Sequence, residues 1–400
     1  MDTTIALRKN IKLYYFVEAF TGMLFTIPIW VAFEQRFLTL SQMALLEAIG
    51  FSLNVLFQIP SGALADILGR KKTMIIGWLI SGFSYFITAF SKDVLSMSVG
   101  IICINIGSAF VSGADVALLY DSLKHMGEEA KYPKINIRGN LLYRMSMVFA
   151  IFLGAPLSRI FFGLPYFLRG VFNLLSIVFI VQMYEKVDRT HKNSMSSYIL
   201  KLKLGMKELV KNEYTKSLTL YYVLIGGITW SCVFYFNNIF ATDVGYSSQG
   251  QSYLFSFLYI LTMIATMAIL EYKKALHKKF VYLAFPILLA ISFLPSVFAN
   301  KTMAVFILIG VIISSGARFS ILDSFVNEEF ETAHRATALS ALNMLVNIAY
   351  IIIVFFSGPI QERYSTKLVY SLLGLIVLFL VIPSGLFLIK ALNKRTSSAT

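Results

Sequence analysis

Four charged residues interrupt long apolar runs of this sequence: Glu18, Glu47, Asp115 and Arg144. In the middle of a membrane span such a charge costs about 2.5–3.5 kcal/mol on insertion scales, so each is expected to face a cavity or a partner. A buried carboxyl group can take up and release a proton, because its pKa rises on desolvation and falls when it meets water or a cation. We therefore predict that the three acids bind a proton or a small solute, with Arg144 as the competing cation. Asp115 lies near the end of its run, so a role in a gate is an equal alternative.

Amide side chains at helical spacing share these apolar runs. Glu47, Asn54 and Gln58 are separated by seven and four residues, which places them on one face of a helix. Hydrogen bonding between neighbouring helices is the alternative use of such groups in a membrane bundle. The amides that we predict to line a polar cavity are Asn54, Gln58, Asn140, Asn343 and Asn347.

The elements that carry these residues must be membrane-spanning helices. The chain of 400 residues is 57% hydrophobic and 14% charged, which leaves too little polar surface for a water-soluble globule. Spans in lipid are helical because the bilayer core offers no partner to an unpaired backbone group. We predict an all-α integral membrane protein with twelve transmembrane helices, at 11–33, 41–63, 74–91, 95–119, 135–161, 164–184, 216–241, 250–272, 280–299, 302–322, 336–358 and 366–390.

The net charge of +14 follows membrane sidedness rather than a nucleic-acid surface. Of the 35 Lys and Arg residues, 26 lie in the termini and in alternate loops on one side of the predicted spans. The positive-inside rule assigns that side to the cytosol. We predict a multi-pass protein of the cell membrane with both termini cytosolic, whose partner is the lipid bilayer and not a nucleic acid.

The two halves of the chain resemble each other at an offset of about 202 residues. Asp121-Ser122-Leu123 ends the fourth predicted span, and Asp323-Ser324-Phe325 ends the tenth. A repeat of this kind predicts two pseudo-symmetric six-helix bundles about a central cavity. The predicted domains are an N-terminal bundle at 1–184, a cytosolic linker at 185–215 and a C-terminal bundle at 216–400.

The linker contains an apolar stripe with lysines between its members. Ile199, Leu202, Met206 and Leu209 recur at helical spacing, while four lysines form the polar complement. This pattern predicts an amphipathic helix at the membrane interface, with a solvated linker as the alternative.

A glycine-rich basic loop stands between the second and third predicted spans, with the sequence Gly62-Ala-Leu-Ala-Asp66-Ile-Leu-Gly69-Arg70-Lys71. The glycines permit close helix approach and a sharp reversal, and Asp66 can pair with Arg70 or with free N–H groups at a helix end. The loop resembles the signature G-x-L-A-D-r-x-G-r-k of the major facilitator superfamily, except that Ile67 replaces the usual basic residue.

This resemblance covers the whole chain and implies the twelve-span fold of that superfamily. It further implies that Asp66 and the basic residue after it hold a cytosolic gate, with Asp121 at the end of the fourth span as a partner. A simple topological anchor is the alternative. Drug-efflux members are the nearest subtype, although no arginine precedes Gly107 in the fourth span and the fifth span carries only a weak version of their glycine pattern at Gly154.

Enzyme motifs are missing from the sequence. It contains no P-loop, H-E-x-x-H or G-x-S-x-G pattern, and Cys103 and Cys232 lie far apart without companion histidines. We predict no catalytic residue, no metal site and no cofactor.

We expect instead a monomeric, proton-coupled exporter of a small hydrophobic or cationic solute, working by alternating access. Three deep acids against Arg144 and a more peripheral Arg318 favour such a solute over an anion. A solute importer or facilitator is the alternative mechanism, and a non-transporting sensor or membrane enzyme is the alternative class.

Overall fold

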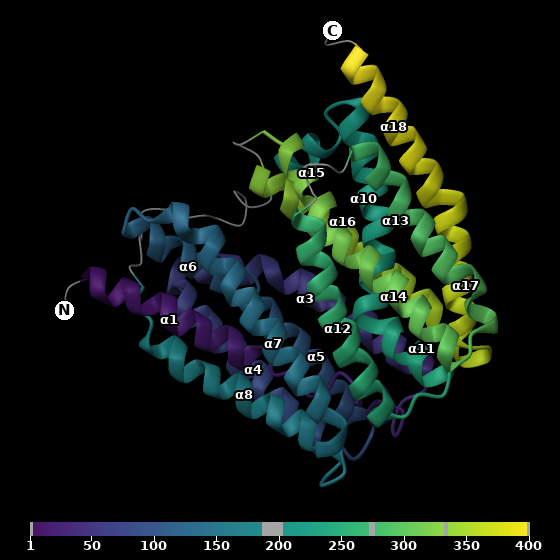
Figure 1. Cartoon of the computed structure of the whole chain (residues 1–400). Helices are drawn as coiled ribbons and strands as arrows, with labels where there is room; N and C mark the ends of the chain where they lie inside the picture. Colours follow the sequence, from purple (N-terminus) through teal and green to yellow (C-terminus); the bar gives the residue numbers. More distant parts are fainter. Residues whose placement is uncertain (1–2, 186–202, 272–276, 332–334, 398–400) are drawn as a thin grey trace. The chain divides into compact units, whose positions relative to one another are not determined.

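The computed structural model describes residues 3–185, 203–271, 277–331 and 335–397, and Figure 1 shows that these segments are mainly helical. The described residues contain no strand. The prediction of an all-α protein is confirmed. Ile199 and Leu202 of the predicted amphipathic linker lie outside the described residues; residues 203–209 are helical, and Leu209 is buried.

Within residues 3–185, the described part of the first half, there are nine helical elements. They are α1 (Thr3–Thr21), α2 (Trp30–Glu34), α3 (Leu40–Leu68), α4 (Arg70–Ala89), α5 (Val94–Val111), α6 (Ala114–His125), η1 (Glu129–Lys131), α7 (Tyr132–Ser158) and α8 (Leu164–Gln182).

Several helices of the second half are interrupted by tighter or wider turns. The elements are α10 (Glu213–Ser231), η2 (Cys232–Phe236), α11 (Asn237–Asp243), α12 (Ser248–Glu271), α13 (Lys278–Phe293), η4 (Leu294–Phe298), α14 (Lys301–Ala317), η5 (Arg318–Leu322), α15 (Asp323–Glu329), α16 (Arg335–Arg363), α17 (Thr366–Ile376), η6 (Val377–Val381) and α18 (Ile382–Ser397). The segments η2, η5 and η6 are π-helices, a geometry that often marks functional positions.

Nine helical segments in the described part of the chain are long and apolar enough to cross a membrane. Three predicted spans fall outside this set. The helix α1 carries Arg8, Lys9 and Lys12, α4 opens with three basic residues, and α14 is a shorter apolar helix that continues as π-helix. The count of twelve stays a prediction.

The first predicted span, 11–33, is not one helix. The helix α1 ends at Thr21, residues 22–29 form turns, and α2 begins at Trp30. Pro28 in this turn has no N–H to donate to a helical ladder. The turn packs against Gly154 of α7, where an added Cβ would lie 2.2 Å from the carbonyl oxygen of Phe25. The glycine therefore permits the close approach of this break.

The fourth predicted span, 95–119, also breaks. The helix α5 ends at Val111, and Gly113 has a φ of +79°, a left-handed conformation that glycine adopts without strain. The helix α6 then starts at Ala114, which places Asp115 in its first turn. The acid therefore stands at a helix N-terminus, where the helix dipole favours a negative charge.

Contacts group the chain into two compact units that do not coincide with the halves of the sequence. Unit 1 comprises residues 1–38, 49–198 and 248–256, and unit 2 comprises 39–48, 199–247 and 257–400. The start of α3 thus belongs with the C-terminal half, and the start of α12 belongs with the N-terminal half. Within unit 2, the carboxylate of Glu362 accepts hydrogen bonds from the Thr39 hydroxyl at 2.9 Å and the Ser41 N–H at 3.0 Å.

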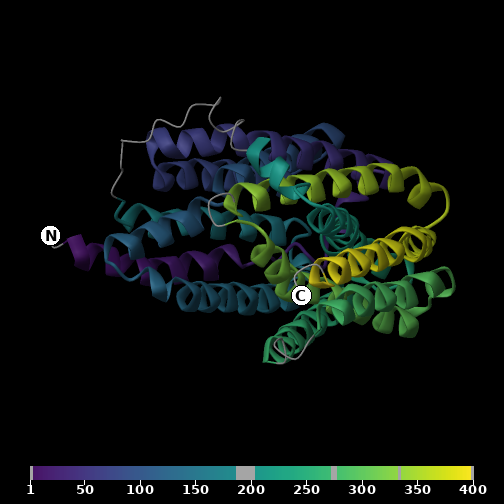
Figure 2. The same cartoon turned by 90° about the horizontal axis from the view of Figure 1, so that it is seen from above.

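Helices in each unit pack through small residues. In unit 1, α4 lies against α5 and α8, and α1 lies against α7 and α8, an arrangement that the view in Figure 2 also shows. A Cβ on Gly77 would lie 2.7 Å from the carbonyl oxygen of Gly107, so α4 and α5 approach with backbone almost in contact. In unit 2, α10 packs on α16 and α18, and α13 packs on α14.

Candidate functional site

The glycine-rich loop ends in a capped helix. Gly69 has a φ of +96°, and a Cβ there would lie 2.6 Å from a carboxylate oxygen of Glu185. That carboxylate accepts hydrogen bonds from the backbone N–H groups of Arg70 at 2.6 Å and Lys71 at 3.1 Å. Glu185 therefore satisfies free donors at the start of α4 and places a negative charge at the positive end of its dipole.

Two basic side chains tie α4 to neighbouring helices of unit 1. The guanidinium of Arg70 forms an ion pair with the carboxylate of Asp121 at 2.6 Å, and both side chains are partly exposed. The ammonium of Lys71 donates to the carbonyl oxygens of Val181 at 2.6 Å and Met183 at 2.8 Å, at the end of α8. The structure thus joins Arg70 with Asp121, the partner that the sequence resemblance implied.

The other signature residues are placed differently. Asp66 lies in α3, and its side chain is outside the described residues. Gly62 is exposed, and no described atom lies within 4 Å of the position that its Cβ would take. The close helix approach predicted at Gly62 is therefore not found, whereas Glu185, which sequence reasoning missed, is central to the loop.

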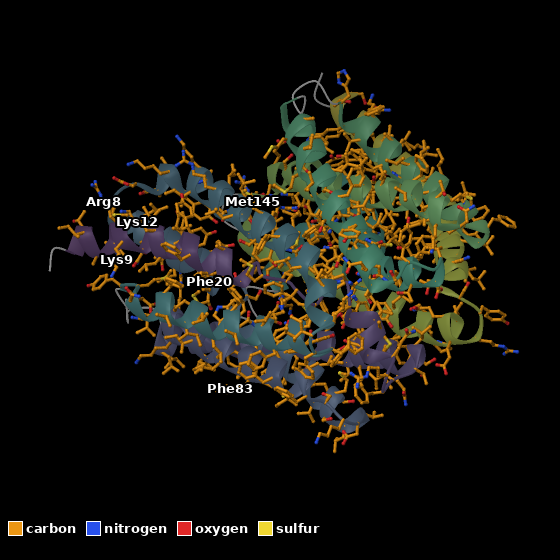
Figure 3. All side chains as sticks on the ribbon, turned by 60° about the horizontal axis from the view of Figure 1, so that its bottom comes forward. Arg8, Lys9, Lys12, Phe20, Phe83 and Met145 are labelled. Carbon is orange, nitrogen blue, oxygen red and sulfur yellow. The ribbon has the colours of Figure 1, made fainter. Side chains whose placement is uncertain are left out.

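Two of the predicted acids lie in unit 1 and influence each other electrostatically. Glu18 on α1 is 9% exposed, interacts with the hydroxyl of Tyr14 one turn earlier, and lies close enough to Asp115 for their charges to repel. The Tyr14 hydroxyl also donates to Asn136 at 3.1 Å. A small pocket is lined by Tyr14, Asp115 and the polar side chain of Ser122. Figure 3 shows Arg8, Lys9 and Lys12 at the far end of the same helix, away from Phe20.

The remaining charged residues lie elsewhere. Glu47 belongs to unit 2, where its carboxylate accepts a hydrogen bond of 2.5 Å from the hydroxyl of the fully buried Tyr350. Arg144 is exposed and takes part in none of the ion pairs found among the described residues. Glu18 and Asp115 therefore share unit 1 while Glu47 belongs to unit 2, and Arg144 forms no ion pair with a described acid.

The amides predicted to line a cavity have mixed surroundings. Asn54 donates to the Asn105 carbonyl at 2.9 Å and the Ser108 hydroxyl at 2.7 Å, and Gln58 donates to Asn54 at 2.9 Å. The bonds from Asn54 join α3 to α5. This corresponds to the alternative role of the amides, hydrogen bonding between neighbouring helices. Asn140 and Asn343 are exposed. Asn347 is buried, and its side-chain oxygen has no partner among the described atoms.

Sequence reasoning also undervalued Arg318, which it placed at the periphery. Arg318 is 1% exposed and begins the π-helix η5. Its guanidinium lies 4.7 Å from the ring centroids of Tyr222 and Phe319, and the Tyr222 hydroxyl donates to Asp323 at 2.5 Å. The sequence did contain a signal for this site: an arginine ends an apolar run five residues before the aspartate of the repeated tripeptide.

The chain was compared with known proteins. A search of curated protein sequences gave no match. Among solved structures, the nucleoside transporter NupG has a TM-score of 0.74 at 17% identity, covering 97% of this chain and 99% of that chain. A D-xylose-proton symporter has a TM-score of 0.68 at 12% identity and covers 96% of each chain. A POT family transporter in complex with 5-aminolevulinic acid has a TM-score of 0.69 at 13% identity, over 96% of this chain and 95% of that one.

The family comparison agrees with the signature loop and the helical fold. The family model of the Major Facilitator Superfamily matches residues 13–353, which is most of the sequence. The similar solved structures have the same fold, at identities too low to carry a substrate across. The chain is therefore a transporter rather than an enzyme, and it belongs to the Major Facilitator Superfamily.

Proposed function

We propose that this transporter couples the movement of a small, largely hydrophobic solute to protons. The observation that carries the proposal is the pair of acids Glu18 and Asp115 beside Tyr14, inside unit 1. Two nearby carboxyl groups whose charges repel favour a state in which one of them holds a proton. Binding that proton removes their mutual repulsion, and release of the proton restores it.

The expected preference for a cationic solute loses part of its basis. It assumed that Arg318 is peripheral, whereas this side chain is buried in unit 2. We therefore keep the hydrophobic character of the solute in the proposal and drop its positive charge.

Export is the direction that we propose, because the signature loop is prominent in efflux members of the superfamily. The ion pair of Arg70 with Asp121 and the capping of α4 by Glu185 support a role of this loop as a latch of the cytosolic gate. Import is the second candidate, favoured by the fold similarity to a D-xylose-proton symporter. The latch and the acid pair serve either direction.

The coupling proposal is tested in proteoliposomes with an imposed pH gradient and a pH-sensitive dye inside. Addition of a transported compound from a panel of phenylacetate, phenethylamine and benzyl alcohol should dissipate the gradient. Glu18→Gln and Asp115→Asn should abolish this response, because neither amide can carry the proton. The control Glu128→Gln removes a partly exposed loop acid and should behave like wild type. Wild-type dissipation in both acid variants would contradict the proposal.

We also propose that the chain acts as a monomer in the cell membrane with both termini cytosolic. Replacing Cys103 and Cys232 with serine and introducing Arg70→Cys gives a single reporter thiol. An impermeant maleimide should label it in inverted vesicles and not in intact cells. Labelling from outside intact cells would contradict this topology and show that the loop faces the outside.

A further inference from the structure

We propose that Arg318 binds a carboxylate group of the transported solute, in a site built from α10, α14 and η5 of unit 2. The proposal rests on the function as a solute transporter and names the chemical class of its substrate, an aromatic or otherwise apolar monocarboxylate. It does not depend on proton coupling.

Buried Arg318 has a hydrogen-bonding contact with the Tyr222 hydroxyl, which leaves part of its guanidinium without an acceptor. The side chain is 1% exposed, and its Nε and Nη1 atoms have no hydrogen-bond partner among the described residues. None of the ion pairs found in that part of the chain includes Arg318. Buried donors are nearly always satisfied, and unsatisfied charged ones are costly, so two free N–H positions on one guanidinium require an explanation.

The aromatic contacts of Arg318 compensate only part of this deficit. The guanidinium lies over the rings of Tyr222 and Phe319, each at 4.7 Å from the centroid. Such contacts stabilise a desolvated cation, but they act on the face of the guanidinium and not on the donors at its edge. The edge therefore remains available to an oxygen acceptor.

The acid nearest to Arg318 is engaged with another group. Asp323 accepts a hydrogen bond from the Tyr222 hydroxyl at 2.5 Å, and the charge of Arg318 acts on it without an ion pair. Asp323 and Tyr222 therefore orient and partly balance the guanidinium, and they leave its Nε and Nη1 atoms open. A carboxylate that arrives with a solute is the matching group in charge and in acceptor geometry.

Backbone features make room for the guanidinium. A Cβ on Gly226 of α10 would lie 3.2 Å from the Nη2 atom of Arg318 and 2.9 Å from the side chain of Val346, so only glycine leaves this space open. The π-helix at Arg318–Leu322 inserts a wider turn where the arginine begins. Together they indicate a position shaped for this side chain rather than an arginine buried by accident.

Other unsatisfied polar atoms occur on the helices around α10. The hydroxyl of Ser314, one turn before Arg318, is fully buried and has no partner among the described atoms. Asn347 of α16, next to Val346, has an unpaired side-chain oxygen. Since α14 and α16 both pack on α10, the interior of unit 2 carries unused hydrogen-bonding capacity. The apolar body of the solute would lie against Phe319, which contacts the ring of Trp230.

The proposal is tested by binding to the purified full-length protein in detergent. Trp230 serves as the fluorescent reporter, with Trp230→Phe to identify its signal. The probes are phenylacetate, phenethylamine and phenyl phosphate. Phenylacetate should quench or enhance the signal saturably and raise the melting temperature of wild type, whereas phenethylamine should do neither.

Arg318→Gln should weaken phenylacetate binding by at least about tenfold, and Arg318→Lys, which keeps the charge, by less. The matched control is Arg169→Gln, which removes a unit 1 arginine that also lies over a tyrosine ring and has an unpaired Nε. It should leave the binding constant unchanged. If Arg318→Gln does not fold, the wild-type preference for phenylacetate over phenethylamine, together with Arg318→Lys, still decides the question.

Equal binding of phenylacetate and phenethylamine by wild type, or unchanged phenylacetate binding in Arg318→Gln, would overturn the assignment. Tighter binding of phenyl phosphate than of phenylacetate would overturn the carboxylate class. Because this assay uses no pH gradient, its failure removes the Arg318 site alone, while failure of the proteoliposome test removes proton coupling alone.

Discussion

The repeated tripeptide places an aspartate at corresponding positions of the two halves, and the structure gives these aspartates different surroundings. Asp121 forms an ion pair of 2.6 Å with Arg70, in a partly exposed position beside the signature loop. Asp323 accepts a hydrogen bond from the buried Tyr222, near an arginine that is itself buried. A repeat in sequence therefore does not imply a repeat in chemistry.

The difference arises from where each acid finds its cation. Asp121 pairs with Arg70, which lies at the start of another helix, α4. The cation that acts on Asp323 is Arg318, which lies about one turn earlier in the same helical run and forms no ion pair with it. At the offset of about 202 residues, the position of Arg318 corresponds to Val116, and that of Tyr222 corresponds to Phe20. An exposed pair is screened and easily broken, as a gate requires, while a buried charge acts strongly on a bound solute.

The largest effect is expected from Asp323→Asn, compared with Asp121→Asn. The first change leaves Arg318 buried with no nearby negative charge, which should lower the free energy of unfolding by up to about 3–5 kcal/mol. The second breaks an exposed pair and should cost at most about 1 kcal/mol. Thermal unfolding in detergent measures both. Phenylacetate should restore part of the stability of Asp323→Asn, and equal losses in the two variants would erase the contrast between the halves.

The glycines of the two regions provide the next test. Gly226→Ala places a methyl group against Arg318 and Val346, and overpacking of this kind costs about 1–3 kcal/mol. Gly62→Ala adds a methyl group where no described atom lies within 4 Å, so the melting temperature should stay the same or rise slightly. Both glycines lie in helices, so the gain in helix propensity is common to the pair. A destabilised Gly62→Ala protein would show that the loop is packed more tightly than described.

Glu185→Gln should have a smaller effect. The amide oxygen can still accept one of the hydrogen bonds from Arg70 and Lys71, but the NH2 group cannot accept the other, and the charge at the start of α4 is lost. A loss of about 0.3–1 kcal/mol is expected from the helix dipole. The difference from wild type should shrink in high salt, because the site is partly exposed. A salt-independent loss would assign Glu185 a packing role instead.

The smallest effect is expected at Glu128, a partly exposed acid on the loop after α6. The hydrogen bond from Lys131 and the charges of Lys131 and Arg8 lower the pKa of Glu128 from its ordinary 4.5. A lowered pKa in the folded state means that the contribution is present at neutral pH and is lost as the pH falls through the folded pKa. Glu128→Gln should therefore unfold at a slightly lower temperature than wild type at pH 7. The two proteins should converge once the pH has fallen below the folded pKa, and a difference that persists in stronger acid would not come from this charge.

Much of the fold and part of the site follow from the order of the residues alone. Hydropathy, loop charges and the signature motif predicted the helical membrane bundle, the superfamily and the pairing of Arg70 with Asp121. The breaks at residues 22–29 and at Gly113 were missed, because each apolar run looks continuous in hydropathy. The burial of Arg318 was misjudged, since distance from the end of a span says nothing about which neighbouring helix covers a side chain.

By itself, the sequence determined what each segment can be: an apolar helix, a basic loop or a capped turn, because these depend on neighbours within a few residues. The tertiary structure decided which groups meet. It brought Glu18 to Asp115, assigned Glu47 to Tyr350 in the other unit, capped α4 with Glu185 and closed Tyr222 and Phe319 around Arg318. Each of these contacts joins distant positions or depends on the face that a helix presents, and in lipid that face is selected by close packing and polar pairing rather than by hydrophobicity.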